Sequence, residues 1–271
     1  MTTTRSVLVS PVHSLVTGPA DSHGILLLHG AGGSPRANYP FQAELPGRAV
    51  APFYPGTGPA PAAGGPVEID TLVAAALAAA DDAGLATMDV VGYSLGAAVA
   101  IRIAARHPHR VRRLLLAAGL AHASPSLRLT LATWLALLER ADDPEGAMAH
   151  GRFLAWVSSS EQHWDRTDRG HDGATEPEEV AALIAANRPP GTAELVRLLG
   201  RLDVRPDLPH VTAPTLVVVA ADDRLIHPSH SDALLAGIPG ARRAEVRAGH
   251  NLAWETPSEL QGAILEHLGD R

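Results

Sequence analysis

The chain has 271 residues, of which 46% are hydrophobic and 19% charged, and this composition is typical of one large globular domain with a sizeable core. A formal net charge of −7 disfavours nucleic acid as a partner. The absence of cysteine excludes disulfides and a cysteine nucleophile, and the absence of lysine excludes Schiff-base chemistry.

The first ten residues carry one arginine and one short apolar run, which is not the pattern of a signal peptide. No apolar stretch approaches the roughly 18 residues that a membrane span requires. We therefore expect a cytoplasmic protein that does not associate with membranes. The sequence indicates no particular oligomeric state.

Short apolar runs alternate with helix-like segments along most of the chain. The predicted strands are two within 6–18, and one each at 24–28, 48–53, 88–91, 113–117, 215–220 and 244–246. The predicted helices between them are 69–83, 95–106, 230–236 and 257–268. This alternation predicts an α/β fold with a mostly parallel, doubly wound sheet flanked by helices.

The alternation stops between residues 121 and 212, where only helices are predicted. These helices are 127–140, 145–157, 178–186 and 192–202, with a polar loop at 158–176. The tip of that loop, 165–175, has almost nothing to bury and is expected to be disordered. We interpret 121–212 as a helical cap, or lid, inserted into a core formed by residues 1–120 and 213–271.

The most informative motif is Gly92-Tyr93-Ser94-Leu95-Gly96, which lies between a predicted strand and a predicted helix. A serine at a sharp strand-to-helix turn is exposed as a nucleophile, and the flanking glycines allow neighbouring backbone to pass closely. A serine hydroxyl is a weak nucleophile at neutral pH, so it requires a histidine base and a carboxylate that orients the histidine.

The order of such residues along the chain agrees with this chemistry. In folds with a serine at this turn, the acid follows the serine and the histidine comes last. Here Ser94 is followed by Asp222 and Asp223 after the strand at 215–220, and then by His250. Either aspartate satisfies the order.

Four segments together resemble the α/β-hydrolase family over nearly the whole chain except the cap: HGAGGS at 29–34, GYSLG at 92–96, ADDRLIHP at 221–228 and GHNLAWETP at 249–257. The resemblance implies an α/β-hydrolase fold and a Ser-His-Asp triad under a variable lid. It implies Ser94 as nucleophile, His250 as general base and then acid, and Asp223 as the acid. Ala220 stands where the family usually has the glycine of a Gly-x-x-Asp pattern.

An oxyanion hole requires two backbone N–H donors aimed at the developing negative charge. The turn supplies one from Leu95, which also begins a helix with a favourable dipole. The loop after strand 24–28 should supply the other, with Ala31 as first choice and Gly32 as second. His29 is expected to support this loop structurally.

Aromatic residues are few, and they gather near these motifs and in the predicted cap. Only ten of the 271 residues are Phe, Trp or Tyr. We therefore expect an apolar substrate pocket lined by Tyr93, Trp134, Phe153, Trp156 and Trp254. The tryptophans of the cap could instead be packing anchors, and for the cap arginines Arg152 and Arg188 a solvated face is favoured over contact with an anionic substrate.

These observations predict a serine hydrolase that cleaves a carboxylic ester, thioester or lactone of moderate size, with an apolar portion, through an acyl-enzyme. The same triad also serves carbon–carbon bond hydrolysis and acyl transfer, and a ligand-binding or cyclase-like protein without hydrolysis is a further alternative. No cofactor is expected. A metal-dependent hydrolase is disfavoured, because the pairs His107 with His109 and His227 with His230 lack a third ligand at usable spacing.

Overall fold

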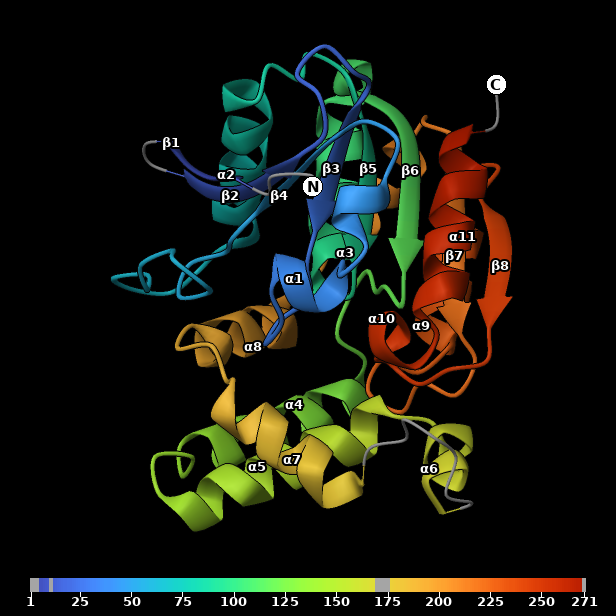
Figure 1. Ribbon diagram of the computed structural model, residues 1–271. Coiled ribbons are helices and arrows are strands. Elements are labelled where there is room, and N and C mark those ends of the chain that lie inside the picture. Colours follow the sequence, from blue (N-terminus) through green and yellow to red (C-terminus); the bar gives the residue numbers. More distant parts are fainter. Residues whose placement is uncertain (1–4, 10–11, 169–175, 270–271) are drawn as a thin grey trace.

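The computed structural model describes residues 5–9, 12–168 and 176–269, which fold around one eight-stranded sheet (Figure 1). The strands are β1 (Arg5–Val9), β2 (Val12–Thr17), β3 (Gly24–Leu28), β4 (Arg48–Pro52), β5 (Met88–Tyr93), β6 (Val111–Ala117), β7 (Thr215–Ala220) and β8 (Arg242–Val246). Their order is β1-β2-β4-β3-β5-β6-β7-β8, and only the pairings made by β2 are antiparallel. The predicted mostly parallel α/β sheet is confirmed.

Helices connect most of these strands, and two more follow the last strand. The α-helices are α1 (Pro35–Asn38), α2 (Ile69–Asp82), α3 (Leu95–Arg106), α4 (Pro125–Leu138), α5 (Pro144–Ser158), α6 (Glu161–Asp168), α7 (Pro177–Ala186), α8 (Thr192–Arg201), α9 (Ser229–Gly237), α10 (Leu252–Glu255) and α11 (Pro257–Gly269). Three short 3-10 helices are η1 (Gln42–Glu44), η2 (Pro108–Arg110) and η3 (Arg205–His210).

Alternate residues of the central strands divide between two hydrophobic cores. Leu26 and Leu28 of β3 belong to the core formed with α2 and α3, whereas Ile25 and Leu27 belong to the core formed with α11. All four side chains are fully buried, as expected for a strand covered by helices on both faces. The period-two geometry of a strand is therefore what places helices on both sides of the sheet.

The helices α4 to α8 lie between β6 and β7 along the chain. In Figure 1, α4, α5, α7 and α8 gather beyond the end of the sheet toward which the arrows of β6 and β8 point. The division into a core and a cap at residues 121 and 212 stays a prediction. Within the described residues, no helix is both long and apolar enough to span a membrane.

The predicted polar loop at 158–176 is wrong in part, because α6 lies within it. The backbone N–H of His163 donates to Ser160 Oγ at 3.1 Å, which caps the first turn of this helix. The His163 ring also packs against Trp254 at a centroid distance of 4.6 Å. A helix this short is stabilised by tertiary contacts that periodicity does not reveal. Residues 169–175, at the predicted disordered tip, lie outside the described residues.

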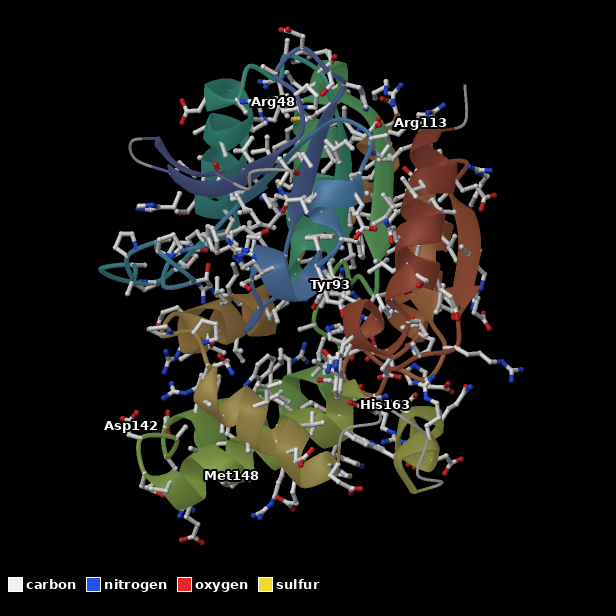
Figure 2. All side chains as sticks on the ribbon, viewed as in Figure 1. Arg48, Tyr93, Arg113, Asp142, Met148 and His163 are labelled. Atoms are coloured by element: carbon white, nitrogen blue, oxygen red, sulfur yellow. The ribbon has the colours of Figure 1, made fainter. Side chains whose placement is uncertain are left out.

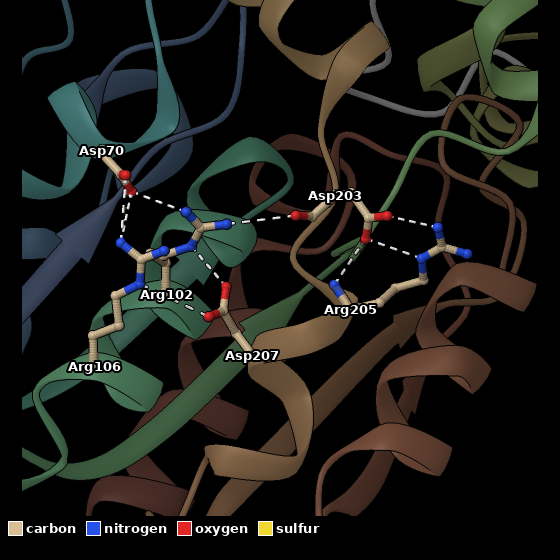
Figure 3. A network of polar contacts seen from close by, with 6 residues as sticks. All are labelled: Asp70, Arg102, Arg106, Asp203, Arg205 and Asp207. Carbon is tan, nitrogen blue, oxygen red and sulfur yellow. Dashed lines mark hydrogen bonds and ion pairs between the residues drawn. The ribbon is translucent and has the colours of Figure 1, made fainter.

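A network of ion pairs connects α3 to the segment by which the chain returns to the sheet (Figure 3). The Arg102 guanidinium contacts Asp207 of η3 at 2.6 Å and Asp70 of α2 at 2.9 Å. It also donates to the backbone oxygen of Asp203 at 3.4 Å. The side chains of Arg102 and Asp207 are only 12% and 14% exposed, so this pair is shielded from screening by water.

We expect Arg102→Ala to lower the free energy of unfolding by about 2–3 kcal/mol, because it leaves the largely buried Asp207 carboxylate without its closest cation. The control is Arg106→Ala on the same helix. The Arg106 side chain is 49% exposed, and its loss is expected to cost about 0.5–1 kcal/mol. Urea unfolding followed by circular dichroism measures both values. Equal costs for the two variants would contradict the role assigned to Arg102.

Candidate active site

Ser94 is the single residue between β5 and α3. Its backbone conformation is one that residues with a side chain rarely adopt. Its φ and ψ are 55° and −118°. Such strain is typical of functional sites, where the surrounding structure enforces it. A Cβ on Gly92 would lie 2.5 Å from the Gly96 oxygen, and a Cβ on Gly96 would overlap the carbonyl oxygen of Leu28. The two glycines therefore permit a turn that no larger residue would allow.

The structure brings the side chains of three predicted site residues into one hydrogen-bonded chain. His250 Nε2 lies 3.0 Å from Ser94 Oγ, and His250 Nδ1 lies 2.7 Å from Asp223 Oδ2. All three residues are buried. This arrangement can pass the hydroxyl proton of the serine to an imidazole that a carboxylate holds in one orientation.

Asp223 and its neighbour Asp222 have different environments. The second oxygen of Asp223, Oδ1, accepts hydrogen bonds from the backbone N–H groups of Leu225 at 2.9 Å and Ile226 at 2.7 Å. These bonds orient the carboxylate so that its other oxygen faces His250. The side chain of Asp222 is exposed, and Asp222 donates its backbone N–H to Ala248.

Glu255, a buried residue of α10, joins the loop that carries His250 to the segment before α6. One of its oxygens accepts from Ser160 Oγ at 2.6 Å and from the N–H of Gly249 at 3.2 Å. The other accepts from the N–H of Ser160 at 3.0 Å. The Tyr93 hydroxyl also donates to the backbone oxygen of His250. The loop that carries His250 is therefore held by both Glu255 and Tyr93.

The loop after β3 runs alongside Ser94. A Cβ built on Gly30 would lie 3.1 Å from Ser94 Cβ. The N–H of Gly30 donates to Asn38 Oδ1 at 2.9 Å, which fixes the start of the loop. Among the described residues, neither the N–H of Ala31 nor that of Leu95 donates a hydrogen bond. Both amides are thus available to an acceptor.

His29 is fully buried at the base of this loop. Its Nδ1 lies 2.8 Å from the backbone oxygen of Gly30, and its Nε2 accepts from the N–H of Tyr54 at 3.3 Å. Burial lowers the pKa of His29 to about 4, so the ring is neutral at neutral pH. With both ring nitrogens engaged by the backbone, His29 supports the loop.

A cavity of about 1190 Å³ extends from this loop and His250 to helices α4, α5 and α7. Three of the predicted pocket residues line it, namely Tyr93, Trp134 and Trp254. Tyr93 is labelled in Figure 2, where it lies between the end of the sheet and those helices. Ala31 and Gly32 line the cavity as well.

The other two predicted pocket residues, Phe153 and Trp156, are not among the residues that line this cavity. Helix α5 contributes His150, Leu154 and Ser158, which are spaced by four residues and share one face. Trp156 is 59% exposed, and Phe153 packs against the main hydrophobic core.

Several residues of the site were not identified from the sequence. Asn38 accepts from the N–H of Gly30, and Glu255 accepts from the N–H of Ser160. No local sequence pattern marks either contact. His150 lies within helix α5 and belongs to no recognisable motif. Among the residues that the structure describes, no group of three or more His, Asp or Glu side chains could hold a metal ion.

Comparisons with known proteins identify relatives of this chain. A family model described as the alpha/beta hydrolase family matches residues 25–261. The pyrrolizixenacetamide deacetylase of Xenorhabdus hominickii is 30% identical over 241 residues, which are 88% of this chain and 87% of that protein. A putative carbamate hydrolase, RutD, of a Caulobacter species is 26% identical over 266 residues, or 94% of each chain.

The fold is also shared with a solved α/β hydrolase from a Medee basin deep-sea metagenome library. The TM-score is 0.84 at 19% sequence identity, and the match covers 98% of this chain and 97% of the other. The family model covers most of the chain, including the segments that carry Ser94, Asp223 and His250. The chain therefore belongs to the α/β hydrolase family and is an enzyme of the hydrolase class.

Proposed function

We propose that this enzyme is a serine hydrolase that cleaves a carboxylic ester, thioester or lactone with an apolar portion, through an acyl-enzyme on Ser94. The observation that carries the proposal is the hydrogen-bonded chain from Ser94 through His250 to Asp223. The neighbouring cavity supports an apolar portion of the substrate, since Leu154, Leu183 and Ile184 line it.

In the first half of the proposed reaction, Ser94 Oγ attacks the carbonyl carbon while His250 Nε2 takes the hydroxyl proton. The carbonyl oxygen becomes an oxyanion, and the N–H groups of Ala31 and Leu95 donate to it. His250 then gives its proton to the leaving group as the tetrahedral intermediate collapses. Asp223 stabilises the imidazolium that forms during this transfer.

In the second half, a water molecule attacks the acyl carbon. His250 takes one proton from the water, and the second tetrahedral intermediate releases Ser94 with that proton restored to Oγ. The products are the free acid and the alcohol or thiol released earlier, whereas a lactone gives a single hydroxy acid. The names of the two relatives above, a deacetylase and a putative carbamate hydrolase, support cleavage beside a carbonyl carbon.

Labelling with a fluorophosphonate tests whether Ser94 is activated. We expect the wild type to be labelled and Ser94→Ala to lose both labelling and hydrolysis of p-nitrophenyl butyrate, with kcat at least about 10⁴-fold lower. Ser34→Ala is the matched control, because Ser34 lines the same cavity but has no histidine partner among the described residues. It should still be labelled. If neither the wild type nor the control is labelled, the fold serves binding without hydrolysis.

A further inference from the structure

His150 of α5 carries a buried N–H group without a hydrogen-bond acceptor. Its Nε2 accepts from the indole N–H of Trp134 at 3.1 Å. Burial, and then the positive charge of Arg188, lower the pKa of His150 to about 4, so its ring is neutral and carries its proton on Nδ1. Among the described residues, nothing accepts from this Nδ1–H, although His150 is only 1% exposed.

An unpaired buried donor is unusual, because native structures satisfy nearly all such groups. His150 lines the cavity that also borders His250. The unused N–H therefore belongs to a residue that lines the cavity which the proposed function assigns to the substrate. A ligand oxygen in this cavity would complete the hydrogen bonding of the ring.

Trp134 links His150 to the loop beside Ser94. A Cβ built on Gly32 would lie 3.1 Å from Trp134 Cζ2, so the indole packs directly on that loop. The indole ring of Trp134 therefore lies between the loop at Gly32 and His150. A substrate whose scissile carbonyl lies at Ser94 can extend along Trp134 and bring a second polar group to His150.

Arg188 adds positive charge at the same wall, although the sequence favoured a solvated face for it. It lines the cavity, and its side chain is 26% exposed. Its ion pair with Asp142, at 3.3 Å, is weak because the Asp142 side chain is 95% exposed and water screens the interaction. The guanidinium can therefore also attract a carboxylate of a ligand.

We propose that the substrate carries a second carbonyl or carboxylate oxygen at the end remote from the scissile bond, and that His150 Nδ1–H donates to it. His150 and Arg188 would then determine specificity toward keto esters or half-esters of dicarboxylic acids. The proposal rests on the proposed function, because it assumes that the scissile carbonyl lies at Ser94. The apolar residues of the cavity would hold the chain between the two polar groups.

A panel of p-nitrophenyl esters of equal chain length tests this proposal. One member is unsubstituted, others carry a keto oxygen at successive positions, and one ends in a carboxylate. In the wild type we expect at least one oxygenated ester to exceed the plain ester about tenfold in kcat/KM, mainly through KM. Equal values across the panel would overturn the proposal while leaving the hydrolase assignment intact.

Two variants separate the two polar groups. We expect His150→Phe to reduce the ratio of oxygenated to plain kcat/KM about tenfold, and His150→Gln, which keeps a donor, to restore part of it. Arg188→Gln should reduce the ratio for the carboxylate ester only. The control is Arg152→Gln on α5, the helix that carries His150. The Arg152 side chain is 59% exposed and pairs with Glu178. Fluorophosphonate labelling of Ser94 shows that each variant is folded.

Binding gives a measurement that does not depend on turnover. The free keto acid and dicarboxylic acid of the same lengths are titrated calorimetrically into Ser94→Ala and into Ser94→Ala with His150→Phe. We expect binding at least tenfold weaker in the double variant. If neither binding nor the kcat/KM ratio depends on His150, the proposal is wrong. If the acids bind through His150 but no ester is cleaved, the proposed hydrolysis is wrong and the subsite stands.

Discussion

Asp223→Asn should lower kcat by about 10⁴-fold with little change in KM, if the proposed mechanism holds. The amide cannot stabilise the imidazolium as a carboxylate does. It can also turn its NH₂ group toward His250 Nδ1, which favours the wrong tautomer of the ring. The buried position and the two backbone donors to Oδ1 leave the side chain little freedom to find another arrangement.

Asp222→Ala is the matched control, because it removes a carboxylate from the adjacent residue. We expect its kcat to stay within about twofold of the wild type, since the Asp222 side chain is exposed and Asp223 is the residue that binds His250 Nδ1. Steady-state hydrolysis of p-nitrophenyl butyrate measures both variants. Similar losses in the two variants would remove Asp223 from the role of the acid.

Gly96→Ala is expected to destabilise the protein by at least about 3 kcal/mol and to abolish most of its activity. A methyl group at this position would overlap the carbonyl oxygen of Leu28. That oxygen cannot move easily, because the Tyr39 hydroxyl donates to it at 2.9 Å. The start of α3 would have to shift away from β3, and the N–H of Leu95 would shift with it.

Gly200→Ala provides the comparison within another helix. Gly200 lies inside α8, and a Cβ there would meet no atom within 4 Å. Alanine is a better helix former, so we expect a gain of roughly 0.5–1 kcal/mol. Thermal unfolding and p-nitrophenyl butyrate hydrolysis measure both effects. An unfolding temperature for Gly96→Ala equal to that of the wild type would show that the turn tolerates a side chain.

Much of the fold could be predicted because local patterns carry it. The apolar runs of the central strands and the amphipathic helices between them have periods that are visible without coordinates. Their boundaries shifted by a few residues, as at β6, which begins at Val111 where the prediction began at 113. The helices α1, α6 and α10 were missed because they are too short for periodicity to detect, and contacts made elsewhere stabilise them.

The pocket prediction shows the limit of composition as a guide. Aromatic residues of the predicted cap were expected to line the cavity, but Phe153 and Trp156 are not among its lining residues. The sequence marks which residues of α5 share a face, yet it does not tell which face meets the cavity. That choice depends on how α5 packs against α4 and α7, which is a long-range property.

The α/β fold and the serine at the turn follow from short-range patterns, since strand and helix periods and the steric demands of a tight turn act between neighbouring residues. The meeting of Ser94, Asp223 and His250 does not, because the sheet brings together segments up to 156 residues apart. Which aspartate reaches the histidine, and which N–H lacks an acceptor, depends on side-chain directions and burial. These arise only when the strands and helices have packed.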